Sequence, residues 1–116
     1  MQEPQSERNT LIRHELWVSM VSLFRSHLAA LEISGKLSGV KIDEPFDNEV
    51  FIGSSAGVLS MWLNTESGEG SLRIITASVD AAEPWSMSTD GTITMFGESL
   101  DDMEIAVELL VATLMK

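Results

Sequence analysis

The sequence contains no cysteine and no tyrosine, and it has only three prolines. Without cysteine the chain can form neither a disulfide framework nor a thiolate metal site, which is compatible with a reducing compartment. No apolar run approaches the roughly 20 residues that a membrane-spanning helix needs, and the polar stretch from Met1 to Arg8 is unlike a signal peptide. We therefore expect a soluble, cytoplasmic protein with no membrane partner.

Basic side chains are scarce, and most of them lie early in the chain. Seven Lys and Arg residues stand against eighteen Asp and Glu residues, which gives a net charge of −11. Residues 1–41 contain five basic and four acidic side chains, whereas residues 42–116 contain two basic and fourteen acidic ones. An acidic surface repels phosphate backbones, so we expect no nucleic-acid partner. Such a surface either aids solubility or selects a basic protein partner.

The 116 residues suffice for one domain, 1–116, and a hydrophobic share of 44% can supply its core. After a loose start over residues 1–5, apolar residues recur in steps of three and four from about Thr10 to Ile33, which predicts a long helix. Gly35 suits the end of this helix. Ser99 is the predicted N-cap of a second helix over 100–115, because acidic residues follow it.

Short runs of apolar and β-branched residues lie between the two helices. The strongest pair, Val58–Asn64 and Ser71–Ala77, flanks a break with two glycines and predicts a β-hairpin. Weaker strands are expected within Lys36–Asp43, at Glu49–Gly53, at Trp85–Ser88 and at Thr92–Phe96, with a tight turn at Asp90-Gly91 and a loop over 78–84. We predict an α+β two-layer sandwich with both helices on one face of an antiparallel sheet of four to six strands.

The two faces of the predicted sheet differ in composition, because strand side chains alternate between faces. The face under the helices is predicted to form the core with Leu59, Met61, Leu63, Leu72, Ile74, Ile93 and Met95. The opposite face carries Trp62, Ile75, Phe96, Phe51 and Arg73. Aromatic residues gathered on a sheet face often mark an interaction surface, so these five are candidate partner-binding residues. The alternative is that the 78–85 loop, with Trp85, folds over this face.

No motif in the sequence supports catalysis. The run from Gly53 to Gly57 matches the G-x-S-x-G spacing of a nucleophile elbow, but a β-rich segment follows Ser55 where that motif needs a helix. The only two histidines, His14 and His27, lie thirteen residues apart, or roughly 20 Å along one helix, which is too far to share a metal ion. We predict no enzyme activity, no catalytic residue, no metal ligand and no cofactor.

Acidic residues cluster around Pro45, and they are Asp43, Glu44, Asp47 and Glu49. Hard cations prefer such oxygen ligands, although the spacing differs from that of an EF-hand loop. A small-ligand or metal-binding protein that uses this 43–49 cluster is therefore one alternative function. An immunity or inhibitor protein that acts on a basic partner is another.

The order, size and charge of the elements resemble those of type III secretion chaperones and related chaperone-like proteins. The resemblance rests on the long first helix, the strand pair from Val58 to Ala77, and Met87–Ile93 followed by the acidic helix from Ser99. It covers most of the chain, without a diagnostic motif, and no helix is predicted between the strand groups, where that family usually has one. The resemblance implies a small cytoplasmic homodimer that holds a protein partner. Frataxin-like proteins share the element order, but their acidic first helix is absent here.

These observations favour a non-enzymatic, chaperone-like or adaptor protein-binding module that forms a homodimer. Its contact surface is expected to be the sheet face with Trp62, Ile75 and Phe96, and its acidic second half is expected to select a basic partner. The last helix offers an alternative dimer surface, because Leu109–Met115 is apolar nearly all round.

Overall fold

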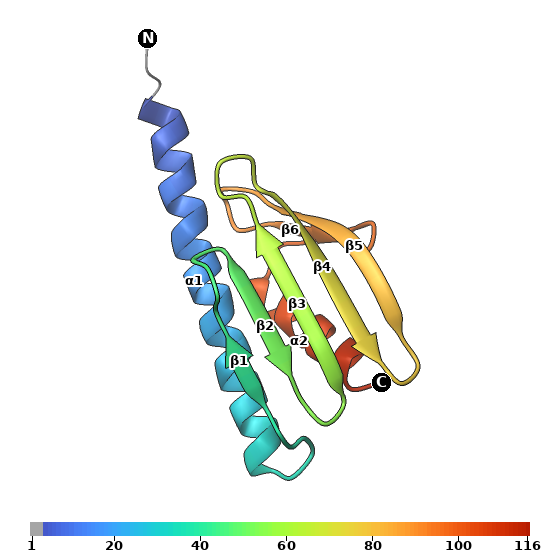
Figure 1. Cartoon of the computed structure of the whole chain (residues 1–116). Helices are drawn as coiled ribbons and strands as arrows, with labels where there is room; N and C mark the ends of the chain where they lie inside the picture. The colour runs from blue at the N-terminus through green and yellow to red at the C-terminus, as the bar shows by residue number, and fades with distance from the viewer. Residues whose placement is uncertain (1–3) are drawn as a thin grey trace.

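The computed structural model describes residues 4–116, which form a helix, seven strands and a second helix in chain order (Figure 1). The elements are α1 Pro4–Ile33, β1 Lys41–Asp43, β2 Glu49–Gly53, β3 Gly57–Leu63, β4 Glu69–Thr76, β5 Asp80–Met87, β6 Ile93–Met95, β7 Glu98–Leu100 and α2 Met103–Leu114. Of the loose start expected over residues 1–5, residues 1–3 lie outside the described part, and residues 4 and 5 already belong to α1.

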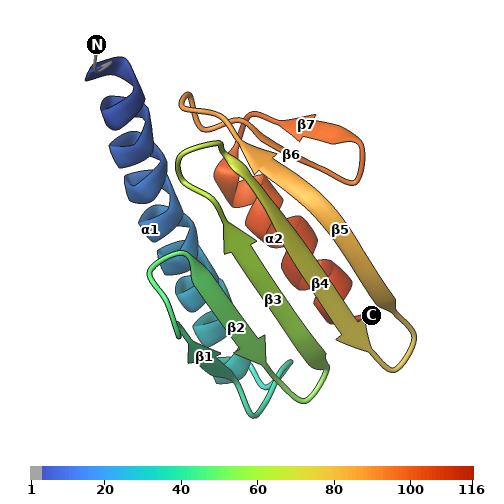
Figure 2. The same ribbon diagram turned by 45° about the horizontal axis from the view of Figure 1, so that its top comes forward.

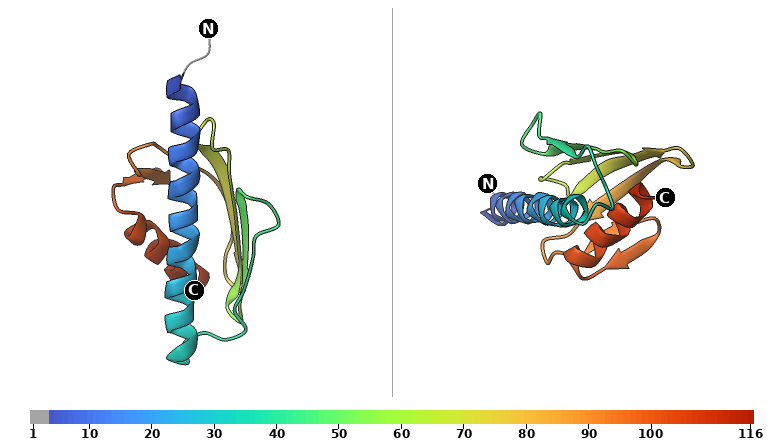
Figure 3. Two further views of the ribbon diagram at one scale, coloured as in Figure 1. Left: turned by 90° about the vertical axis from the view of Figure 1, so that its left-hand side faces the viewer. Right: turned by 90° about the horizontal axis from the view of Figure 1, so that it is seen from below.

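The strands form one antiparallel sheet in which each strand pairs with the next one along the chain, from β1 to β7. Both helices pack on the same, inner face of this twisted sheet, and the outer face is left uncovered (Figures 2 and 3). The predicted α+β class is therefore confirmed. The sheet has one strand more than the six expected at most, because Glu98–Leu100 also pairs, with β6.

α1 begins at Pro4 rather than near Thr10, and proline is favoured at a first helical position because no N–H partner is needed there. Ser6 and Thr10 both lie within the helix, where the Thr10 hydroxyl donates to the Ser6 carbonyl at 3.0 Å. The helix is long and apolar enough to cross a membrane by length and composition, contrary to the sequence expectation. Its buried side nevertheless supplies core residues, among them Trp17 and Phe24.

Gly35 ends α1 as predicted. Its φ of +78° places it in the left-handed region, which glycine adopts without a steric penalty. The Lys36 N–H donates to the Leu31 carbonyl at 2.9 Å, and the Gly35 N–H donates to the Glu32 carbonyl at 3.1 Å. This pair of bonds is the Schellman motif, which satisfies carbonyls that the end of a helix would otherwise leave free.

The predicted central hairpin is formed by β3 and β4, which pair from Gly57 opposite Thr76 to Leu63 opposite Gly70. Asn64 shapes its loop, because its side-chain oxygen accepts from the N–H groups of Glu66 at 2.9 Å and Ser67 at 3.2 Å. Asparagine suits such turns because its short side chain can reach the backbone two residues on.

Arg13 joins α1 to the loop of this hairpin. Its Nε donates to the Met87 carbonyl at 3.1 Å, and its Nη1 donates to the carbonyls of Glu66 at 2.9 Å and Thr65 at 3.4 Å. A Cβ on Gly68 would lie only 2.7 Å from Arg13 Nε. Glycine at position 68 therefore leaves space for the guanidinium group and also adopts the required φ of +80°.

The expected loop over 78–84 is wrong, because Asp80–Met87 forms β5, which pairs with β4 along most of its length. Pro84 argues against a strand at this position in the sequence, since proline lacks the N–H that a residue of a central strand donates. The structure tolerates Pro84 because pairing between β5 and β6 begins only at Trp85, opposite Met95. Trp85 is 3% exposed and lies in the core, so it does not fold over the outer face.

The connection between β6 and α2 also differs from the prediction. Phe96 and Gly97 both have positive φ, +52° and +76°, and make a tight turn into β7. Ser99 belongs to β7, opposite Thr94, and is not a helix cap. Asp102 is the N-cap of α2 instead, and its side chain accepts from the Glu104 N–H at 2.9 Å.

The core lies between the two helices and the inner face of the sheet. All seven sheet residues predicted to form it are at most 2% exposed: Leu59, Met61, Leu63, Leu72, Ile74, Ile93 and Met95. The rings of Trp17 on α1 and Trp85 on β5 stack against one another with centroids 6.2 Å apart. α2 adds one apolar side, on which Ala106, Val107, Leu110, Val111 and Leu114 are buried.

Candidate functional site

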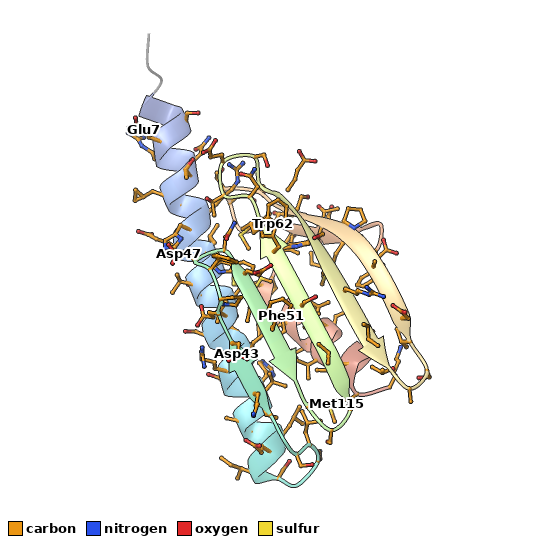
Figure 4. All side chains as sticks on the ribbon, in the orientation of Figure 1. Glu7, Asp43, Asp47, Phe51, Trp62 and Met115 are labelled. Carbon is orange, nitrogen blue, oxygen red and sulfur yellow. The ribbon has the colours of Figure 1, made fainter. Side chains whose placement is uncertain are left out.

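The outer sheet face is one of the surfaces on which large apolar side chains lie beside one another and exposed. Phe51 on β2 is 42% exposed, Val58 and Trp62 on β3 are 44% and 41% exposed, and Ile75 on β4 is 40% exposed. Figure 4 shows Phe51 and Trp62 over β2 and β3 on the side of the sheet toward the viewer. These side chains alternate with buried ones along each strand, as the period of a half-buried strand requires.

Strand register brings the exposed residues of neighbouring strands together. Val58 lies directly opposite Ile75, so an apolar pair spans β3 and β4 at one end of the face. Trp62 lies opposite Glu49 on one side and Ser71 on the other, which leaves its ring between short or flexible neighbours. Directly opposite side chains on one face are close enough to contact one another.

A shallow groove of about 440 Å³ crosses this face from β2 to β5. It is lined by Glu49, Phe51, Ser60, Met61, Trp62, Ser71, Leu72, Arg73, Ala82, Glu83 and Pro84. A second hollow of about 270 Å³ continues beyond Pro84 and Glu83 toward Phe96 and Gly97. The two hollows share Glu83 and Pro84, so together they extend from β2 to the turn after β6.

Phe96 lies in the turn between β6 and β7, although the sequence predicted it to be the last residue of a strand. It is 37% exposed and lines the second hollow, so it lies apart from the cluster around Trp62. Phe96 adopts a positive φ of +52°, which is uncommon for a bulky residue and costs on the order of 1 kcal/mol.

The charges along the two hollows are mostly negative. Glu49 and Glu83 line the larger one, and Glu69 lines the smaller one beside Glu83. Arg73 is the one basic side chain among the residues that line them, and its guanidinium group pairs with Asp80 at 3.2 Å. The pair is exposed and therefore contributes little to stability, but it balances the positive charge of Arg73.

The acidic cluster of residues 43–49 is not gathered into a site. Glu44 forms an ion pair with Arg25 at 2.7 Å, Asp43 lies on β1, and Glu49 lies on β2. Figure 4 shows Asp47 at the turn that joins these strands, away from Asp43. Within residues 4–116, no three His, Asp or Glu side chains are arranged to hold a metal ion.

The serine and histidines singled out in the sequence have structural surroundings. Ser55 lies in the turn between β2 and β3, where its backbone N–H donates to the Ser38 carbonyl at 2.8 Å and its hydroxyl accepts from the Ser38 N–H. A strand and not a helix follows this turn. His14 is exposed and His27 half-buried, both on α1.

A further hollow of about 590 Å³, which no pattern in the sequence indicates, lies beside the first turns of α1. Ser6, Glu7, Thr10, Leu11, His14, Thr65 and Glu66 line it. It exists because Arg13 holds the β3–β4 loop against α1, which is a contact between distant parts of the chain that no local pattern reveals.

Comparisons with known proteins add no further information about this site. The chain matches no protein-family model, and no curated protein or solved structure matches it either. The candidate function therefore rests on the geometry of the outer sheet face.

Proposed function

We propose that this protein is a non-enzymatic protein-binding module whose outer sheet face holds a basic segment of another protein. The observation that carries the proposal is the open groove across β2 to β5, lined by Phe51 and Trp62. Exposed aromatic side chains beside a hollow are the kind of anchor that dominates binding energy in protein interfaces. The groove is shallow, which suits an extended chain better than a small molecule.

Charge supports a basic partner. Glu49 and Glu83 line the groove, Arg73 is neutralised by Asp80, and the chain as a whole carries a net charge of −11. A segment with Lys or Arg beside apolar residues would place apolar side chains on Trp62 and its cations toward these carboxylates. Opposite charges also raise the association rate.

We further propose that the module works in the cytoplasm as a homodimer, in a chaperone-like or adaptor role. The absence of cysteine from the sequence supports the reducing compartment. The acidic cluster of residues 43–49 does not support a metal-dependent alternative, because Glu44 is paired with Arg25 and the other carboxylates lie on different elements.

Two peptides of equal length and equal apolar content test the proposal, one with Lys and the other with Glu at its charged positions. We expect the Lys peptide to shift the NMR signals of β2 to β5 and of the Trp62 indole, and the Glu peptide to shift neither. Raising the salt concentration should weaken the binding, because exposed charges are then screened. Equal binding of the two peptides, or shifts confined to the helices, would contradict the proposal.

Trp62→Ser and Ile105→Ser form a matched pair of variants for this titration. Trp62 is 41% exposed on the outer sheet face, and Ile105 is 52% exposed on α2. Trp62→Ser should leave the fold intact and lower the affinity for the Lys peptide by about tenfold or more, whereas Ile105→Ser should leave this affinity unchanged. Unchanged affinity in the Trp62 variant would show that the face is not the binding surface.

A further inference from the structure

α1 is apolar on two sides, and the fold uses only one of them. Trp17, Phe24 and Leu28 face the core. On the opposite side lies the outer stripe of α1, on which the exposed residues Leu11, Val18, Ser22, Ala29 and Ile33 are interrupted by the exposed Glu15. Leu11, Ser22 and Ile33 are spaced by eleven residues, as are Val18 and Ala29. Eleven residues are close to three helical turns, so the stripe runs straight along the helix.

The large residues of this stripe are strongly exposed. Leu11 is 60%, Val18 52% and Ile33 88% exposed. The helix has enough apolar character to pass as a membrane span by length and composition, yet only 28% of that segment is buried within the molecule. A helix that is apolar on both sides is normally covered on both sides. Figure 3 shows the outward side of α1 uncovered along its length.

Charge selects a second copy of this chain as the cover. α1 carries three basic and three acidic side chains, whereas residues 34–116 carry four basic and fourteen acidic ones. Two copies that met through their acidic parts would repel each other, because like charges are brought together. α1 is the neutral part of the molecule, so two copies can meet there without this repulsion.

We propose that the protein forms a two-fold dimer in which α1 packs antiparallel against α1 of a second copy, with Ser22 at the two-fold axis. In this register Leu11 lies opposite Ile33 of the second copy, so two large side chains meet at each end of the contact. Nearer the centre, the large Val18 lies opposite the small Ser26. Such an interface is self-complementary, as a two-fold axis requires.

Electrostatics favours the antiparallel arrangement over the parallel one. In a parallel pair Glu15 would face Glu15 and Arg25 would face Arg25 of the second copy. In the antiparallel register Glu15 lies opposite Ala29, and Arg25 lies opposite Ser19. Ser22 and Ala29 have small side chains, which lets the two helix backbones approach closely.

The overlap of the two helices is enough for a small interface only. In this register residues 11–33 of each copy overlap, which is about 34 Å of helix, and a contact strip about 10 Å wide would bury roughly 700 Å² over both copies. Biological interfaces generally exceed about 1,000 Å² of total buried surface. We therefore expect a dimer that dissociates on dilution.

Light scattering across a dilution series tests the dimer with two matched substitutions. The expected mass of the native chain at high concentration is twice 12.7 kDa. Val18 is 52% exposed on α1 and Val58 is 44% exposed on the outer sheet face. Val18→Glu should raise the dimer dissociation constant at least tenfold, and Val58→Glu should not change it. A native monomer at all concentrations, or a dimer broken only by Val58→Glu, overturns the proposal.

Single cysteines test the register, because the native chain has none. Under mild oxidation Ser22→Cys should form a disulfide-linked dimer, since residues at a two-fold axis face their own copies within bonding distance. Leu11→Cys should link to Ile33→Cys when the two variants are mixed, but not to itself. Ser71→Cys, exposed on the outer sheet face, is the control that should not link. Efficient linking of Leu11→Cys to itself would overturn the antiparallel register.

A lipid surface is the other cover that such a stripe could take. Flotation with phosphatidylcholine vesicles should leave the native protein in the dense fraction, because the stripe is already covered by the second copy. If the native protein floats with the vesicles and Val18→Glu abolishes this flotation, the stripe binds lipid and the dimer proposal is overturned. The inference does not depend on the proposed peptide groove, since Val58→Glu and Trp62→Ser report on a different face.

Discussion

The indole of the buried Trp85 donates a hydrogen bond to the backbone carbonyl of the exposed Trp62, with its Nε1 3.1 Å from that oxygen. The same nitrogen lies 3.1 Å from the carbonyl of Ser71, the residue opposite Trp62 in the sheet. A core side chain therefore fixes the backbone of both strands at the centre of the outer sheet face. The shape of this face is connected to the packing of the core beneath it.

Replacing Trp85 with Phe should lower the free energy of unfolding by more than the loss of ring volume alone would. The substitution keeps an aromatic ring but removes the donor that two backbone carbonyls share. The loss of a hydrogen bond of this kind costs about 0.5–1.5 kcal/mol. Urea unfolding followed by circular dichroism measures the free energy of unfolding.

Trp17→Phe is the control for this substitution. Trp17 is 1% exposed and stacks on Trp85, but its Nε1 has no hydrogen-bond partner within the described residues. Trp17→Phe therefore removes a similar ring volume and no hydrogen bond, so it should cost less than Trp85→Phe. The opposite order of the two costs would show that the indole hydrogen bond contributes little.

Gly70→Ala should be strongly destabilising, although an alanine side chain is small. A Cβ at position 70 would lie 2.0 Å from the carbonyl oxygen of Trp62 and 2.9 Å from Trp85 Nε1. Relief requires the strands or the indole to move, and overpacking of this kind costs about 1–3 kcal/mol. Gly53→Ala is the control, because a Cβ there would meet no atom within 4 Å. Equal melting temperatures for the two variants would contradict the expected strain.

Arg13→Ala should loosen the connection between α1 and the β3–β4 loop. Arg13 donates three hydrogen bonds to backbone carbonyls across this junction, and the loss should cost about 1–3 kcal/mol. Amide hydrogen exchange should become faster in the first turns of α1 and in the loop. Arg25→Ala removes only the exposed ion pair with Glu44, so we expect a cost below about 1 kcal/mol and no change in exchange at the loop.

Asp90 should make a small contribution to the acid stability of the protein. The hydroxyl of Ser88 and the backbone N–H of Thr92 hydrogen-bond to its carboxylate and lower its pKa from 3.8 to about 2. Because the folded state has the lower pKa, the ionised form stabilises it, so the contribution is present above about pH 4 and is lost as the pH falls through about 2.

The variant Asp90→Asn isolates this contribution from that of the other carboxyl groups. The difference in unfolding free energy between the native protein and Asp90→Asn should shrink as the pH is lowered from about 4 to about 2. Urea unfolding at several pH values in this range measures the difference. A difference that stays constant over the range would show that the lowered pKa of Asp90 does not affect stability.

Local periodicity predicted most of the fold, because a helix or strand that buries one side has apolar residues at regular intervals in the sequence. The alternation in β3 separates the buried Met61 from the exposed Trp62, and the steps of three and four in α1 identify Trp17 and Phe24 as core residues. Gly35 was predicted as the end of α1 for the reason that the structure shows, a positive φ. Such features depend only on neighbours along the chain.

Features that depend on pairing between distant residues were missed. The first half of β5 contains alanine, acidic residues and Pro84, none of which favours a strand, and it is a strand because β4 provides partners for it. Ser99 and Asp102 are both good N-caps by type, and only the pairing of Ser99 with Thr94 in the sheet excludes the former. The tight turn expected at Asp90-Gly91 depends on local sequence and is present, with positive φ at Gly91, +91°.

The candidate site was predicted in part. The alternation of side chains along each strand correctly predicted which residues are exposed, because one face of the sheet must be buried. These residues are Phe51, Trp62, Arg73 and Ile75. The groove across them could not be predicted, since its lining comes from four strands that only pairing between distant residues brings together. The position of Phe96 in a turn depends on the short strand β7, whose three residues have no pattern of their own.

The sequential order of the strands has a consequence for the route by which the chain folds. Every strand pairs with its neighbour in sequence, so each pairing closes only a short loop and loses little chain entropy. The contacts that span the greatest sequence separation are those that α1 makes with β5 and α2, such as Trp17 with Trp85. Because closing long loops slows folding, we expect the docking of α1 onto a largely formed sheet to limit the folding rate.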